Sequence, residues 1–271
     1  MLEQILPPRV AVAESFGNLP DEKLLPEEEA VIVRAAPRRR REFAAGRACA
    51  RVALARLGEP PVPILRGPRN EPQWPAGIAG SITHCTGYRA AAAARAAVVV
   101  ALGLDAEPNE ALPAGVLDVV SLPQERVQLA ALPAAHPKAT ARPDSAVGLD
   151  STVGPDFAAG LDSAAGLDSA AGSDAAVSLD ALWRLDSARP EAVCWDRLLF
   201  CAKESVYKAW FPLAKEWLGF DDAEIIIDVG GTFTARLLVP GPLVNGAPLT
   251  SLHGRWLAVH GLLVAAIALP A

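Results

Sequence analysis

The stretch Gly77–Glu107, GIAGSITHCTGYRAAAAARAAVVVALGLDAE, carries the clearest structural signal in the 271-residue chain. It consists of runs of strand-forming or small residues that are separated by Thr86-Gly87 and by an alanine-rich turn. Short apolar runs between turn residues are typical of antiparallel strands. The sequence therefore predicts three strands here, at residues 78–83, 88–94 and 98–105.

Two helices are predicted outside this stretch. The first spans residues 37–57, with Pro37 in its first turn and Gly58 after its end. Residues 59–72 follow it as an extended loop, because prolines interrupt any helix there. The second helix spans residues 195–211 and carries Lys203, Glu204 and Lys208. Further strands are expected at 223–229 and 232–239, and a last pair of strands is expected within 256–269 around His260-Gly261.

The charge of the chain is unevenly distributed. The net charge is −6, but residues 34–69 hold ten arginines and two glutamates, so this segment carries +8 and the remainder −14. A basic segment in an acidic protein favours a bound anion over bulk nucleic acid, which usually requires a basic domain. A solvated arginine-rich helix face is the alternative that charge alone leaves open.

Aspartate recurs every six residues from Asp144 to Asp186, and glycine follows the same period over part of that segment. A left-handed β-helix is one interpretation, but the segment is short, follows Pro143, contains Pro155 and has few bulky residues. Its small-residue composition instead favours a flexible acidic surface loop without a chemical role.

The cysteines and the apolar tracts indicate the cellular location of the protein. Cys49, Cys85, Cys194 and Cys201 form no CxxC pair and have no histidine at metal-ligand spacing, which predicts free, mostly buried thiols. The first residues lack the pattern of a secretory signal, and the apolar tract 256–271 is interrupted by His260-Gly261. We therefore expect a cytoplasmic protein that does not bind membranes.

Three carboxylates are candidates for a metal site. Asp105 and Glu107 have i, i+2 spacing, which places both side chains on one face of an extended chain, and Glu204 lies on the second helix. Carboxylates are hard oxygen ligands of the kind that Mg²⁺ or Mn²⁺ prefers. A metal with nearby arginines would suit a pyrophosphate, although solvated surface charge is the usual explanation for three carboxylates alone.

Five motifs in order resemble the 4′-phosphopantetheinyl transferases of the surfactin- and enterobactin-synthase-activating type, including their actinobacterial members. These motifs are Arg41–Arg51, Glu71–Gly77, Gly80–Cys85, Gly103–Glu107 and Phe200–Lys208. The resemblance implies a pseudo-twofold α+β fold of two similar halves, with the active site in the cleft between them. The expected halves are residues 1–104 and 105–271, the second containing a low-complexity flexible insertion at 130–190.

The resemblance also implies roles for individual residues. Contacts to coenzyme A are expected from Arg39, Arg47, Arg66, His84, Lys203 and Lys208. The metal, Mg²⁺ or Mn²⁺, would be held by Asp105, Glu107 and Glu204. Glu204 would act as the general base and Lys208 would stabilise charge on the diphosphate. Trp217 matches an aromatic position near the pantetheine or the carrier protein.

The function that the resemblance implies is transfer of 4′-phosphopantetheine from coenzyme A to a serine of apo acyl- or peptidyl-carrier proteins, with release of 3′,5′-bisphosphoadenosine. Such enzymes serve fatty acid, polyketide and nonribosomal peptide biosynthesis, and a monomer is expected. The alternatives are a metal-dependent pyrophosphohydrolase, which would need no protein acceptor, and a non-catalytic coenzyme A-binding regulator, which would not need Glu204.

Overall fold

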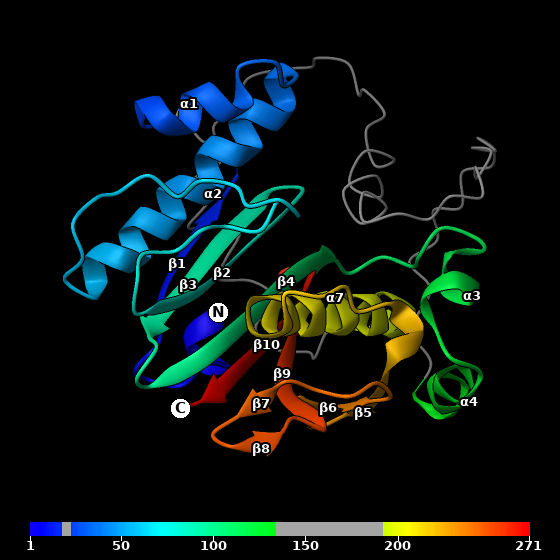
Figure 1. The fold of residues 1–271 in the computed structure, drawn as a ribbon. Coiled ribbons are helices and arrows are strands. Elements are labelled where there is room, and N and C mark those ends of the chain that lie inside the picture. Colours follow the sequence, from blue (N-terminus) through cyan, green and yellow to red (C-terminus); the bar gives the residue numbers. More distant parts are fainter. Residues whose placement is uncertain (18–22, 134–191) are drawn as a thin grey trace, which may run out of the picture. The chain divides into compact units, whose positions relative to one another are not determined.

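Two antiparallel sheets, each packed against a 20-residue helix, make up most of the fold (Figure 1). The computed structural model describes residues 1–17, 23–133 and 192–271, which all belong to one compact unit. Helices and antiparallel strands occur in separate blocks of the sequence, as in other α+β proteins. The predicted α+β class is therefore confirmed.

The smaller sheet has the strand order β1-β3-β2, formed by Ala11–Phe16, Tyr88–Arg95 and Ile78–Cys85. Helix α2 (Pro37–Arg56) lies on it and buries Ala50, Ala53 and Leu54 against alanines of β3. The run of alanines in β3 is explained by this contact, because small side chains let a helix lie close to the sheet. The short helices η1 (Leu2–Gln4) and α1 (Pro26–Ile32) precede α2.

The larger sheet has the strand order β4-β10-β9-β6-β5. Its strands, in chain order, are β4 (Val99–Pro108), β5 (Ala223–Asp228), β6 (Thr232–Leu237), β9 (Ser251–Val259) and β10 (Leu262–Pro270). Helix α7 (Trp195–Ala214) packs against this sheet. The remaining elements are α3 (Val116–Val120), α4 (Pro123–Ala131), η2 (Phe220–Asp222), β7 (Leu243–Val244) and β8 (Ala247–Pro248).

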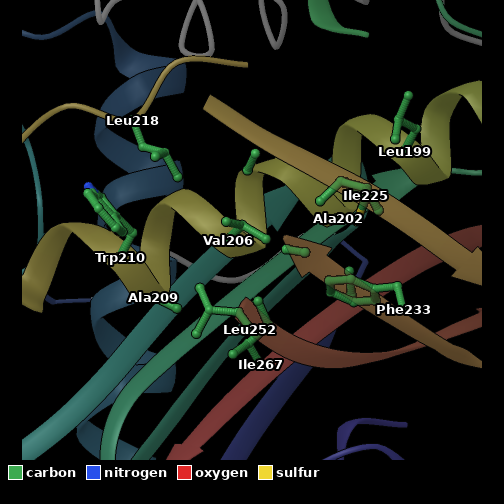
Figure 2. Packing of buried hydrophobic residues seen from close by; sticks show 14 of the residues in the cluster. Leu199, Ala202, Val206, Ala209, Trp210, Leu218, Ile225, Phe233, Leu252 and Ile267 are labelled. Atoms are coloured by element: carbon green, nitrogen blue, oxygen red, sulfur yellow. The ribbon is translucent and has the colours of Figure 1, made fainter. Parts of the chain in front are cut away.

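The largest core cluster lies between α7 and the larger sheet (Figure 2). Helix α7 contributes Ala202, Val206 and Ala209, and the sheet contributes Ile225, Phe233, Leu252 and Ile267. Strands β4 and β10 are also buried on their opposite face, in a cluster that contains Leu104 and Val264. Strands buried on both faces have nearly continuous apolar sequences, which explains the apolar C-terminal tract. Among the described residues, no helix is both long and apolar enough to span a bilayer.

The two sheets are joined at β2 and β4 by side chains instead of a strand ladder. The Ser81 hydroxyl accepts a hydrogen bond from the Leu104 N–H at 3.0 Å, and the Thr83 hydroxyl accepts one from the Ala106 N–H at 3.0 Å. All four groups are buried, so these hydroxyls satisfy backbone donors that would otherwise lack partners. Two hydroxyl residues thus connect the smaller sheet to the strand that carries Asp105.

Most sequence-based element predictions are confirmed. Both long helices and the strands of residues 78–108 lie where expected, to within a few residues. None of the four cysteines forms a disulfide, and all but Cys194 are buried. The sequence interpretation did not include β1, α1, α3 and α4. The aspartate repeat and most of the predicted insertion lie outside the described residues.

Candidate active site

The candidate site begins at the end of β4, where Asp105 and Glu107 are 5% and 8% exposed. Each carboxylate contacts a cation from α7. Lys208 Nζ lies 2.6 Å from Asp105 Oδ1, and Arg197 Nη1 lies 2.9 Å from Glu107 Oε2. Both acidic side chains therefore face the same helix, as their i, i+2 spacing predicts.

Helix α7 presents these cations because of its residue spacing. Arg197, Cys201, Glu204 and Lys208 are separated by four, three and four positions, which places them along one face of a helix with 3.6 residues per turn. Gly103 permits this face to approach β4. A Cβ atom at Gly103 would lie only 1.9 Å from the Ser205 backbone oxygen.

Arg197 was not among the predicted site residues, although it contacts one of them. Besides Glu107, its guanidinium donates to the carbonyl oxygens of Glu110 and Ala111, both at 3.1 Å. These contacts fix the arginine to the segment that follows β4. Arg197 lies seven residues before Glu204, which is two helical turns away on the same face. This spacing is the sequence signal that could have identified Arg197.

The two carboxylate oxygens of Asp105 differ in their contacts. Oδ1 contacts two side chains, whereas Oδ2 lacks a nitrogen or oxygen donor among the described residues. Thr83 Oγ1 donates to Oδ1 at 3.3 Å, in addition to the contact with Lys208. Oδ2 is buried and accepts no hydrogen bond from a nitrogen or oxygen donor among the described residues. Burial, together with the charges of Asp105 and Glu107, raises the pKa of the Cys201 thiol.

Lys208 is held in its cationic form. Burial by itself lowers the pKa of Lys208, but the negative charges of Asp105 and Glu204 outweigh burial and raise the pKa above its usual value. Lys208 therefore lies within electrostatic range of a carboxylate on β4 and of another one turn earlier on α7.

Glu204 is half-buried and lines a pocket beside α7. Tyr207, Trp217 and Leu218 line the same pocket, and the rings of Tyr207 and Trp217 lie 4.8 Å apart, centroid to centroid. Trp217 is 45% exposed, which leaves an aromatic surface open to solvent next to Glu204. Such a surface suits an apolar chain or a partner protein better than it suits a phosphate.

The donor set at the end of β4 fits a small divalent cation. In the part of the chain that the structure describes, no three His, Cys, Asp or Glu side chains are grouped to hold a metal ion. However, Mg²⁺ in phosphate-processing sites usually takes one or two carboxylates, several waters and the substrate phosphates. Asp105 and Glu107 supply two carboxylates, and the buried Asp105 Oδ2 is available as a ligand.

A cluster of arginines lies on α2 and the loop after it. Arg47 is 6% exposed, donates through Nε to the Ile64 carbonyl at 2.8 Å and stacks on the Phe43 ring. Burial, together with the charges of Arg66 and Arg39, lowers the pKa of Arg47 to about 10, although Glu28 opposes the shift. Burial and Arg39 likewise lower the pKa of Arg66. Mutual repulsion among these cations favours a bound anion.

His84 connects this arginine cluster to the site on α7. Its Nε2 lies 3.2 Å from Arg39 Nη1. Burial and the charge of Arg39 lower the pKa of His84 to about 4, with Lys208 and Arg89 adding to the effect and Glu42 opposing it. His84 is therefore neutral at pH 7, beside cations from both parts of the site.

Lys203 occupies a different place from the one predicted. Its ammonium pairs with Glu125 at 2.9 Å and donates to the carbonyl oxygens of Phe220 and Ala223. These three acceptors use all the N–H donors of the ammonium, and the side chains of Lys203 and Glu125 are 3% and 1% exposed. In this structure Lys203 joins α7 to the segment around β5 and has no donor left for coenzyme A.

Comparison with known proteins identifies relatives along the chain. Residues 27–94 match the model of the 4′-phosphopantetheinyl transferase N-terminal domain, and residues 177–257 match that of the 4′-phosphopantetheinyl transferase superfamily. The chain is 45% identical over 275 residues to the 4′-phosphopantetheinyl transferase Svp of Streptomyces mobaraensis, covering 100% of this chain and 90% of Svp.

Two further relatives show the same extent of similarity. Identity is 39% over 278 residues to PptT of Mycobacterium tuberculosis, covering 99% of this chain and 98% of PptT. It is 42% over 277 residues to Npt of Nocardia iowensis, covering 99% of both chains. Both relatives are named 4′-phosphopantetheinyl transferases.

Proposed function

The chain belongs to the 4′-phosphopantetheinyl transferase superfamily and transfers phosphopantetheine from coenzyme A to carrier proteins, and we propose that the carboxylates at the end of β4 and Glu204 form its metal site. Because the chain belongs to this superfamily, the two alternative functions, a metal-dependent pyrophosphohydrolase and a non-catalytic coenzyme A-binding regulator, are not supported. The proposed ligands are Asp105 and Glu107 on β4, and Glu204, which the structure does not group with both of them, is proposed to join them when the metal binds. A bound Mg²⁺ or Mn²⁺ would neutralise charge that develops on the diphosphate.

The phosphates of coenzyme A are proposed to bind the arginine cluster together with His84 and Lys208. The charge of Arg39 contributes to the lowered pKa of both Arg47 and Arg66, and that of Arg66 contributes at Arg47, so a bound anion would relieve repulsion among these cations. His84 contacts Arg39, and Lys208 adds to the lowering of its pKa. This series of positive charges extends from α2 to α7, which suits a ligand with a 3′-phosphate and a diphosphate.

The reaction on this arrangement is a displacement at the β-phosphorus of coenzyme A. The oxygen of the carrier serine forms a bond to that phosphorus, and the bond from phosphorus to the bridging oxygen breaks, so that 3′,5′-bisphosphoadenosine leaves. A serine hydroxyl is weakly nucleophilic at neutral pH. Glu204 is the proposed acceptor of its proton, and Lys208 stabilises the negative charge on the leaving diphosphate oxygen.

The observation that carries this assignment is the pairing of Asp105 with Lys208. The 2.6 Å contact brings Lys208 of α7 onto Asp105 at the end of β4, which supports placing the site there. Glu204 is one turn from Lys208 and contributes to the raised pKa of that lysine. One acid on a strand and one acid on a helix therefore lie near a single cation, which supports placing the proposed metal ligands and the proposed diphosphate contact in one site.

The test replaces Glu204 with glutamine, which keeps the shape but removes the proton acceptor. Mass spectrometry of an apo carrier protein, incubated with coenzyme A and Mg²⁺, should show at least about a hundredfold slower gain of phosphopantetheine. Coenzyme A binding without metal should be unchanged, because it depends on the arginines. The control is Glu216→Gln, an exposed glutamate after α7. A Glu204→Gln enzyme with near-normal turnover would exclude Glu204 as the base.

We also propose the division into residues 1–104 and 105–271, because α2 and the smaller sheet precede the boundary, α7 and the other strands of the larger sheet follow it, and β4 (Val99–Pro108) spans it. The aspartate repeat is proposed to have no part in transfer. Deleting residues 146–181 should leave the rate of transfer to a carrier protein within a few fold. A loss of more than tenfold, in a variant that still folds, would show that the repeat contributes to the reaction.

A cytoplasmic location and a monomeric state complete the proposal. Four cysteines outside any disulfide suit a reducing compartment. Size-exclusion chromatography with light scattering tests the monomer directly, and a dimer at micromolar concentration would contradict it.

A further inference from the structure

The two cations that α7 places on the acids of β4 differ in how firmly they are held. The Arg197 guanidinium has three acceptors, the Glu107 carboxylate and two backbone carbonyls, and its side chain is 15% exposed. Lys208 Nζ, within the described part of the chain, hydrogen-bonds only to Asp105, and its side chain is 28% exposed. Arg197 is therefore fixed in place, whereas Lys208 can exchange one acceptor for another.

The position of Lys208 conflicts with the role assigned to Asp105. A divalent cation on the Asp105 carboxylate would lie within a few ångströms of the ammonium, and like charges at that distance repel strongly in a partly buried site. The repulsion disappears if the ammonium moves to another anion. The diphosphate of coenzyme A would be such an anion, since Lys208 lies within electrostatic range of His84 and hence of the arginine cluster.

We propose that Lys208 couples the binding of the metal to the binding of coenzyme A. Without coenzyme A, the Lys208 ammonium neutralises the Asp105 carboxylate. When the diphosphate binds, the ammonium moves to it, and the negative charge of Asp105 is then available to the metal. This inference rests on the proposed metal and phosphate sites. Because coupling between two ligands is reciprocal, the metal should also raise the affinity for coenzyme A. Arg197 cannot change partners, so it should affect metal affinity equally with and without coenzyme A.

The experiment measures the Kd of Mn²⁺ on the full chain by electron paramagnetic resonance, without coenzyme A and with coenzyme A at saturation. The ratio of the two values is the coupling factor. In Lys208→Met, Mn²⁺ should bind at least about tenfold more tightly without coenzyme A, and the coupling factor should fall more than threefold. In Arg197→Gln both Kd values should fall together, which leaves the coupling factor unchanged.

Two controls keep the result interpretable. Lys215→Met removes one positive charge from an exposed position at the end of the same helix and should change neither Kd. Lys208→Arg keeps the charge and should retain the coupling, provided that circular dichroism shows it to be folded. A coupling factor in Lys208→Met within threefold of the parent value would overturn the inference.

The assignment of the site is tested separately by Asp105→Asn. If this variant binds Mn²⁺ as well as the parent does, the metal site itself is misplaced. If it loses Mn²⁺ while Lys208→Met keeps the parent coupling factor, only the role of Lys208 is wrong.

Discussion

Replacement of Gly103 by alanine should damage stability and catalysis together, because this glycine sets the distance between β4 and α7. A Cβ atom at this position would lie 1.9 Å from the Ser205 oxygen and 2.9 Å from the Ala209 nitrogen. Both are backbone atoms, so no change of rotamer can relieve the clash. The helix must move away from the strand by at least about 1.1 Å to restore the shortest contact that real Cβ atoms make.

The size of the effect follows from that displacement. Overpacking of this kind costs about 1–3 kcal/mol of unfolding free energy, which for a chain of this length lowers Tm by roughly 2–6 °C. The same movement separates Lys208 from Asp105 and Arg197 from Glu107, which are now 2.6 and 2.9 Å apart. A misplacement of about 1 Å in a catalytic site can reduce the rate about a hundredfold.

The assay combines thermal unfolding with carrier modification followed by mass spectrometry. The matched control is Gly254→Ala on β9, where a Cβ atom would lie 2.1 Å from the Phe233 ring, also within the larger sheet but two strands from Gly103. It should lower Tm while the turnover of the folded enzyme stays close to normal. A Gly103→Ala enzyme with parental Tm and turnover would refute the close approach of α7 to β4.

Three further variants test the charged groups. Arg47→Ala should weaken coenzyme A binding by about 1.5–3 kcal/mol, roughly ten- to a hundredfold, in calorimetry, whereas Arg38→Ala, exposed and paired with Glu42 on the same helix, should not. Burial and Arg39 lower the pKa of His84 to about 4, so the unfolded chain binds the extra proton first. Stability should therefore fall as pH drops from about 6.5 to about 4, and His84→Asn should reduce that slope in urea titrations at both ends of the range. Glu125→Gln leaves Lys203 without a counter-charge in a buried site and should cost about 3–5 kcal/mol of unfolding free energy, whereas Asp118→Asn, in an exposed pair, should cost less than about 0.5 kcal/mol. Equal losses in those last two variants would contradict the structural role of Lys203.

The elements with strong local signals were predictable from the sequence. Helix α2 has proline at its start and glycine beyond its end, and β2 and β3 are separated by Thr86-Gly87. Strand β1 gave no such signal, because Ala11–Phe16 is short and acquires its place only by pairing with β3. Its position depends on a contact between residues about 75 positions apart, which local patterns do not contain.

The parts of the site that depend on residue spacing within one strand or one helix were predictable from the sequence. The common face of Asp105 and Glu107 follows from the alternation of side chains in a strand, and the face of Glu204 and Lys208 follows from the helical repeat. The placement of Lys203 did not follow, because its partner Glu125 lies on α4, which had no recognised signal. The same limit applies to Arg197, whose role depends on carbonyl groups of the segment after β4.

The hydroxyl contacts between β2 and β4 also bear on how the protein avoids self-association. An unpaired strand edge is a template for aggregation, and β4 pairs with β10 on one side only. Ser81 and Thr83 cover two N–H groups of its other edge with single hydrogen bonds, so that edge is closed to other chains although no strand pairs with it. Because side chains make this junction, no strand register has to be kept between the two sheets.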